Sequence, residues 1–153
     1  GTEIVSISGL EQLNEGVTPK TVRVTVTPSE FSAEGKSVIE TALKANNNDI
    51  QFIFAQNDEM GIGAAQAVKD AGLTPGTDVK IATIDGTKGA LEALAAGELS
   101  FVAQYNPFFG DVAVEVVEKA LAGESVENPL IVESDTFDSP EAAQAALDGG
   151  KGF

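Results

Sequence analysis

The chain has 153 residues, of which 42% are hydrophobic, enough for one domain with a sizeable core. Its 24 acidic and 9 basic residues give a net charge of −15, so it lacks the cationic surface that nucleic-acid binding requires. It contains neither cysteine nor histidine, which excludes disulfides, zinc–thiolate sites and serine–histidine catalysis. No apolar run approaches the roughly 20 residues of a membrane span. We expect no metal and no cofactor.

The first half of the chain alternates between strand and helix patterns. β-branched residues at alternate positions predict a strand over 20–27, and the segment 3–8 has a similar pattern. Ser32 begins a predicted helix with apolar residues on one face. The continuously apolar run 50–55 predicts a strand buried on both faces, and a helix over 59–71 follows it.

The second half continues this alternation. Asn106 and Pro107 form a predicted cap and first-turn pair, and Ser139 with Pro140 opens the last helix. The alternation predicts an α/β fold with a doubly wound parallel sheet, a three-layer αβα sandwich in which ligands bind beyond the carboxyl ends of the strands. The remaining predicted elements are strands over 79–84 and 99–104, an extended run over 129–134, and helices over 88–96 and 107–122.

Polar or aromatic side chains follow four of these strands. Phe31, Asn57 with Asp58, Asp85 and Gln104 come after the first, second, third and fourth strand of the alternation. In a parallel sheet all of them lie along one edge. They offer carboxylates, two amides and a flat apolar ring, a mixture that suits a polyhydroxylated ligand.

At the second strand end, a structural task competes with ligand binding. Asp58 is a natural N-cap for a helix beginning at Glu59, whereas Asn57 has no evident structural task. Gly61 and Gly63 predict close packing of this helix on the sheet. We therefore assign Asp58 to capping and Asn57 to ligand binding.

The other three positions also have structural interpretations. Asp85 and Gly86 can form a turn before a Thr87 cap, Gln104 can simply end a strand, and Phe31 can belong to the core. Their coincidence on one edge favours a binding site over these separate explanations.

Two stretches, "FIFAQNDEMGIGAAQAVKDAGL" and "DVKIATIDGTKGALEALAAGELSFVAQYNP", resemble the C-terminal half of type I periplasmic sugar-binding proteins of ABC importers. The resemblance is to the ribose- and galactofuranose-binding group and runs from about Val22 to the C-terminus. It implies one flavodoxin-like lobe of a clamshell that closes on a sugar. It also implies a stacking contact from Phe31 and hydrogen bonds from Asn57, Asp85 and Gln104.

The resemblance implies a single C-terminal lobe over 1–153, with an atypical segment over 1–18 and no N-terminal lobe. The parent protein is expected in the periplasm or at the bacterial cell surface, with a small saccharide and an ABC permease as partners and no nucleic acid. In the family the helix over 107–122 packs on the other lobe. Here it must pack on its own sheet or on another chain, so self-association through this helix or the open cleft is expected. An isolated lobe should bind sugar only with millimolar or weaker affinity, roughly −4 kcal/mol.

Three alternatives stay open at this point. The same fold serves as the effector-binding domain of LacI-type transcription regulators, although the segment after Asp85 is of the transporter kind. A small carboxylate-dependent enzyme built on Asp58 and Asp85 is the second alternative, and a partner-binding scaffold is the third. We predict a binder and not an enzyme.

Overall fold

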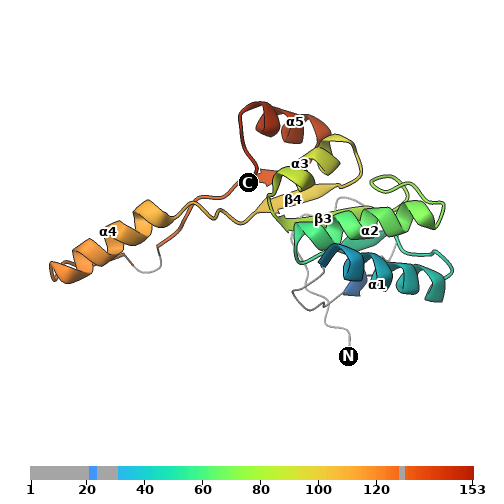
Figure 1. The fold of residues 1–153 in the computed structure, drawn as a ribbon, viewed down its shortest axis with the longest axis horizontal. Helices are drawn as coiled ribbons and strands as arrows, with labels where there is room; N and C mark the ends of the chain where they lie inside the picture. Colours follow the sequence, from blue (N-terminus) through green and yellow to red (C-terminus); the bar gives the residue numbers. More distant parts are fainter. Residues whose placement is uncertain (1–20, 24–30, 128–129) are drawn as a thin grey trace, which may run out of the picture.

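The computed structural model describes residues 21–23, 31–127 and 130–153, which form alternating strands and helices (Figure 1). The predicted strand at 3–8, the segment 1–18 and most of the strand at 20–27 lie outside these residues. The strands are β1 (Thr21–Arg23), β2 (Phe52–Phe54), β3 (Lys80–Asp85), β4 (Phe101–Gln104) and β5 (Thr136–Phe137). The helices are α1 (Phe31–Ala45), α2 (Asp58–Asp70), α3 (Lys88–Ala95), α4 (Gly110–Leu121) and α5 (Pro140–Asp148).

The strands form one sheet in the order β1-β2-β3-β4-β5. The first four run parallel, and β5 pairs antiparallel with β4 through Val102↔Phe137 and Ala103↔Thr136. The predicted α/β class, with parallel strands flanked by helices, is confirmed. The described strands follow the order of the chain and β5 is antiparallel, so this sheet differs from the predicted doubly wound, wholly parallel one. The predicted last extended run at 129–134 is placed too early, because pairing with β4 begins only at Thr136.

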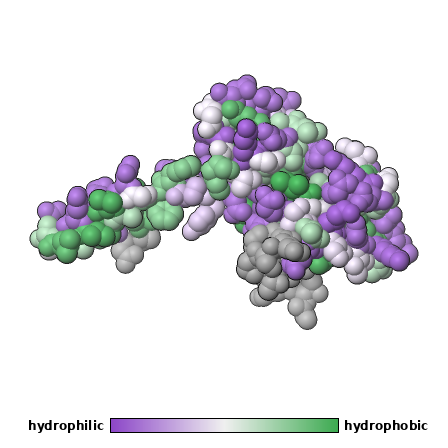
Figure 2. All heavy atoms as spheres, viewed as in Figure 1, coloured by the Kyte–Doolittle hydropathy of each residue, from purple (hydrophilic) through white to green (hydrophobic). Residues whose placement is uncertain are grey.

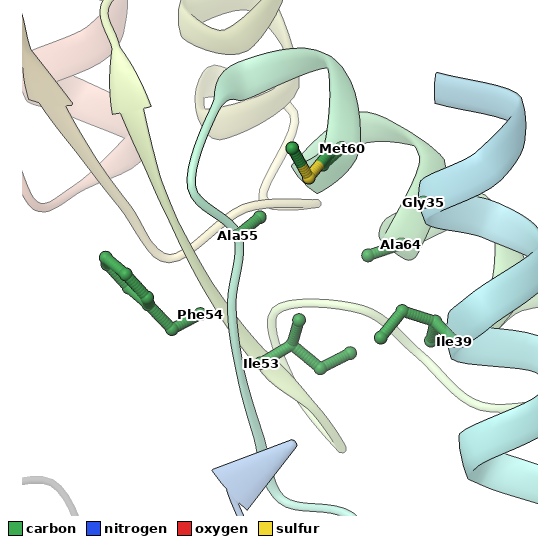
Figure 3. A pocket seen from close by; sticks show the side chains of 7 residues that line it. All are labelled: Gly35, Ile39, Ile53, Phe54, Ala55, Met60 and Ala64. Atoms are coloured by element: carbon green, nitrogen blue, oxygen red, sulfur yellow. The ribbon is translucent and has the colours of Figure 1, made fainter. Parts of the chain in front are cut away.

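The core lies between the sheet and the layer of α1, α2, α3 and α5. Strand β2 shows the alternation: Ile53 is buried and points toward Ile39 of α1, whereas Phe54 points to the opposite side and is only partly buried (Figure 3). Such alternation marks a strand with one face in the core. The largest wholly buried apolar side chains come from both the sheet and these helices: Ile39, Leu43, Ile50, Ile53, Ile81, Leu91, Leu94, Val68, Val79 and Val102.

Two glycines of α2 permit close approach, one to the sheet and one to a helix. A Cβ on Gly61 would lie 2.0 Å from Cγ2 of Thr83 in β3, as the predicted helix–sheet contact requires. A Cβ on Gly63 would lie 2.1 Å from the carbonyl oxygen of Ser32, so this glycine packs against α1 and not against the sheet. The prediction for Gly63 is therefore wrong in its partner.

A shallow hollow lies between α1, β2 and the first turns of α2 (Figure 3). All of its lining residues are apolar: Gly35, Ile39, Ile53, Phe54, Ala55, Met60 and Ala64. A ligand with hydroxyl groups would find no side-chain hydrogen-bond partner there, so the hollow is a feature of packing between layers.

Helix α4 begins later than predicted, at Gly110. Residues 105–109, here called the stalk, connect it to the end of β4 and so to the body, which consists of the sheet with α1, α2, α3 and α5. Asn106 does not cap it. The Asn106 side chain donates to the carbonyl oxygen of Glu133 at 3.0 Å and accepts from the Phe108 N–H at 2.9 Å. The first of these bonds ties the outgoing chain to the returning one, and the second closes a local turn before the helix.

Helix α4 itself stands away from the body, and none of its residues is buried (Figures 1 and 2). Its apolar side chains face solvent, with Val114 58%, Val117 56% and Leu121 84% exposed. Of the two positions predicted for this helix, packing on its own sheet is therefore wrong, and packing on another chain stays a prediction. Among the described helices, none has the length and apolarity needed to cross a membrane.

Candidate ligand-binding edge of the sheet

Three of the predicted site residues lie at the same level of the sheet. Asp85 is paired directly with Gln104 in the β3–β4 register. In the neighbouring register Phe54 is paired with Ala82, and Asn57 and Asp85 each lie three residues further along their chains. The parallel strands thus bring these side chains to one edge, as predicted from their positions after the strands.

Asp58 is the structural centre of this edge. Its side chain is wholly buried and accepts four hydrogen bonds. Oδ1 accepts from the Thr83 hydroxyl at 2.6 Å, and Oδ2 accepts from the Gly86 N–H at 2.9 Å. The Thr87 N–H and hydroxyl also donate to Oδ2, at 2.7 and 2.9 Å. A buried carboxylate needs such donors to replace water, and here all come from the end of β3 and its loop.

The prediction that Asp58 caps α2 and that Asn57 has no structural task is wrong. Asn57 is the N-cap: its backbone is extended, and its Oδ1 accepts from the Met60 N–H at 2.8 Å. Asp58 is the first residue of the helix, and its side chain turns into the protein. The Asn57 amide NH2 donates no hydrogen bond within the part of the chain that the structure describes, so it can still meet a ligand.

Asp85 ends β3 in an unusual conformation. Its φ of 138° is positive, which residues other than glycine rarely adopt, and its side chain is half-buried. Burial raises the pKa of the Asp85 carboxyl, and the charges of Asp58 and Glu59 raise it further, while a hydrogen bond from the Asp58 backbone N–H lowers it. The predicted turn before Thr87 is also present, because Thr87 caps α3 by accepting from the Ala90 N–H.

Gln104 is held from two sides. Its Oε1 accepts from the Asp135 N–H at 3.2 Å, while its own backbone N–H donates to the Asp135 carbonyl oxygen at 2.8 Å. Its side chain lies over Gly86, where a Cβ would come within 2.9 Å of Cγ of Gln104. The amide NH2 of Gln104 therefore sits in a fixed place and keeps its donors for another partner.

The fourth predicted residue, Phe31, is the first residue of α1, and its side chain lies outside what the structure describes. Within the described residues, no group of three or more Asp or Glu side chains is arranged to hold a metal ion. The edge is therefore a hydrogen-bonding surface made of one ionisable carboxylate and two amides.

Sequence reasoning missed the roles of three residues that shape this edge: Asp58 as a buried acceptor, Gly86 under the Gln104 side chain, and Asp135, which holds that side chain. Gly86 could have been identified from the sequence, since a glycine after a strand-end aspartate indicates a tight turn or a positive φ, and its φ here is 88°. Asp58 and Asp135 could not be identified in this way, because their roles depend on segments 25 to 31 residues away in the chain.

Residues 7–125 match the family described as periplasmic binding protein domain. The chain belongs to this family. The fructose import binding protein FruE of Bifidobacterium longum is 52% identical over 113 residues, covering 73% of this chain and 34% of FruE. The galactofuranose-binding protein YtfQ of Escherichia coli is 34% identical, covering 78% of this chain and 38% of YtfQ.

The fold of this periplasmic binding protein domain also matches solved structures. A Mycobacterium smegmatis protein in complex with β-D-fucofuranose superposes with a TM-score of 0.70 at 38% identity, over 78% of this chain and 38% of that one. The chain thus spans about a third to two-fifths of the length of the relatives it matches.

Proposed function

We propose that this domain is one lobe of a saccharide-binding protein and that its ligand is bound at the edge formed by Asn57, Asp85 and Gln104. The observation that carries the proposal is the placement of these three side chains at one level of the sheet, each fixed by its own structural partner. A site fixed in this way loses little conformational entropy when it binds a ligand.

The side chains match a sugar in chemistry. An ionised Asp85 accepts hydrogen bonds from two hydroxyls, and the NH2 groups of Asn57 and Gln104 donate to hydroxyl or ring oxygens. Phe31, at the start of α1, supplies the aromatic ring on which the C–H face of the sugar stacks. We assign these four residues to ligand binding.

The relatives support a small saccharide and a role in import. FruE is named for fructose import, YtfQ for galactofuranose, and the Mycobacterium smegmatis protein was solved with β-D-fucofuranose. We propose that the parent protein captures a monosaccharide outside the cytoplasm and delivers it to an ABC permease, with D-fructose the first candidate. The names of these relatives describe binding, which favours a binder over a carboxylate-dependent enzyme or a regulator.

Titration of the 15N-labelled chain with D-fructose tests the proposal. We expect shifts of the backbone amides around Asn57, Asp85 and Gln104, with a millimolar or weaker Kd, because a single lobe offers half a cleft. Asp85→Asn should weaken the affinity about tenfold or more, since a hydrogen bond to a charged acceptor contributes about 1.5–3 kcal/mol.

Asp111→Asn, on the exposed first turn of α4, is the matched control and should bind like the unaltered chain. Shifts confined to other surfaces, or an Asp85→Asn variant with unchanged affinity, would overturn the assignment. A micromolar Kd would contradict the half-cleft argument.

We also propose that the isolated chain self-associates through α4. The exposed apolar side chains Val114, Val117 and Leu121 recur at helical spacing and have no partner among the described residues. Sedimentation should show a concentration-dependent oligomer that Val117→Glu dissolves, whereas Glu118→Gln, on the same helix, should leave it intact. A monomer at all concentrations would rule this out.

A further inference from the structure

Among the described residues, Asp58 is the only charged residue that is wholly buried, and all of its side-chain hydrogen bonds go to one segment of the chain. All four of its hydrogen-bond donors belong to Thr83, Gly86 and Thr87, which flank Asp85 on both sides. A carboxylate is the one side chain of this length that accepts without donating, so it can satisfy every one of these donors. The first turn of α2 is thereby fastened to the end of β3 across 25 to 29 residues of sequence.

Asp85 needs such fastening. Its positive φ is a conformation that persists only where the surrounding structure enforces it. The backbone that follows Asp85 is fixed, because the N–H groups of Gly86 and Thr87 both donate to Oδ2 of Asp58. The Asp85 carbonyl oxygen accepts from the Tyr105 N–H at 2.8 Å, which fixes it to β4 as well.

We infer that Asp58 is a positioning residue for the saccharide site: it makes no contact with the ligand but holds Asp85 and the 85–87 loop in the binding conformation. This inference rests on the proposed function. It makes the affinity of the edge depend on a side chain that solvent and ligand never reach.

The first test measures the loop without any ligand. Asp58→Asn keeps the size of the side chain but removes its charge, so that the Gly86 and Thr87 donors lose a charged acceptor. Hydrogen exchange of the Gly86 and Thr87 amides should then be faster by about tenfold or more, as expected for the loss of bonds to a charged acceptor.

Thr83→Val is the matched control. It removes one hydrogen bond to Asp58 at nearly constant volume but leaves the bonds to Gly86 and Thr87 in place. It should lower global stability and leave exchange in the loop unchanged. Equal loop exchange in Asp58→Asn and Thr83→Val would overturn the positioning role.

A second readout follows the carboxyl of Asp85 by 13C NMR over pH. The charges that raise its pKa come from Asp58 and Glu59, beside the effect of burial. The Asp85 titration should move to lower pH in Asp58→Asn and stay in place in Thr83→Val, which a general loss of stability would not produce.

If Asp58→Asn does not fold, Thr87 provides the same test. Thr87→Ala removes the hydroxyl that bridges Asp58 and the Ala90 N–H, and Thr87→Ser retains it. Loop exchange should be faster in Thr87→Ala than in Thr87→Ser, and identical rates in the two variants would overturn the inference.

The last readout is D-fructose binding. Asp58→Asn should weaken the affinity about tenfold, and Thr83→Val should keep it within about twofold. An unchanged affinity in Asp58→Asn would overturn the role in binding. If the unaltered chain shows no sugar-induced shifts while the loop still depends on Asp58, the proposed function fails and the structural link from Asp58 to the loop stands.

Discussion

Helices α2 and α4 are amphipathic segments of similar length that differ in burial. Most residues of α2 are buried against β2, β3 and α1, whereas none of α4 is buried. The apolar stripe of α4 is no weaker, since it carries valines and leucine where α2 carries alanines and glycines. The comparison teaches that helical periodicity predicts a helix with an apolar face but does not tell which surface covers that face.

The difference has an energetic meaning. An isolated 12-residue helix is marginal in water, and most helical stability in proteins comes from packing of the apolar face. The body, made of the sheet with α1, α2, α3 and α5, contains its own partners. The arm, made of the stalk and α4, offers its apolar face no partner among the described residues.

The largest expected contrast comes from the same substitution in the two regions. Leu94 of α3 is fully buried, whereas Leu121 of α4 is 84% exposed. Leu94→Ala should lower the free energy of unfolding by about 2–5 kcal/mol, because it leaves a cavity in the core. Leu121→Ala should change it by no more than about 0.5 kcal/mol.

Urea denaturation followed by circular dichroism measures both variants. At a protein concentration where the chain is monomeric, an equal loss of stability from Leu121→Ala would show that α4 packs on the body in solution, and would end the contrast.

A smaller contrast is expected from glycines. Gly61→Ala places a methyl group against the methyl of Thr83, whose hydroxyl is held by Asp58, and should cost about 1–3 kcal/mol. A Cβ at Gly110 would meet nothing within 4 Å, so Gly110→Ala should stabilise the helical state of α4 by up to about 1 kcal/mol. It should leave the unfolding of the body unchanged. Thermal denaturation separates them, and a Gly61→Ala variant as stable as the unaltered chain would contradict the close packing.

Much of the body was predictable from local patterns. The strands at 52–54, 80–85 and 101–104 and the caps at Thr87 and Ser139 follow from apolar runs and capping residues whose partners lie within three residues. The meeting of Asn57, Asp85 and Gln104 at one level followed from the parallel sheet alone.

The errors share a physical cause. Asn57 and Asp58 are both good caps, and only the donors of β3, far away in sequence, decide that the aspartate turns inward. Asn106 accepts from the Phe108 N–H as a capping residue would, but its NH2 group also donates to Glu133 of the returning chain, and the helix begins only at Gly110. At both positions a hydrogen bond to a distant segment accompanies the departure from the local pattern, and no local pattern reports it.

The smallest expected effects are electrostatic and have opposite signs in the two regions. In the body, burial and the charge of Asp58 raise the pKa of Asp85, so ionisation of this carboxyl opposes folding. In the arm, the hydrogen bond from Lys119, 2.6 Å away, lowers the pKa of Glu115, so ionisation of this carboxyl supports the helix.

The direction of each pKa shift decides how stability depends on pH. Because the pKa of Asp85 is raised in the folded state, its ionisation lowers the free energy of unfolding at neutral pH, and this loss disappears as the pH falls below that pKa. Asp85→Asn should therefore stabilise the body at pH 7 by about 0.5 kcal/mol, a value that allows for solvent screening, and by less at pH 3. Glu115→Gln should instead lower the helicity of α4 at pH 7, and this loss should vanish as the pH falls through the Glu115 pKa.

Denaturation curves and far-ultraviolet circular dichroism at the two pH values measure both effects. If Asp85→Asn destabilises the body at pH 7, the hydrogen bonds that the carboxylate makes in the folded protein outweigh the cost of its burial. Asp85 then serves the stability of the fold in addition to any role in ligand binding. If instead the variant gains stability while losing D-fructose affinity, Asp85 is kept at the edge for binding and at the expense of folding. This trade-off is the one expected of a functional carboxylate in a strained backbone position.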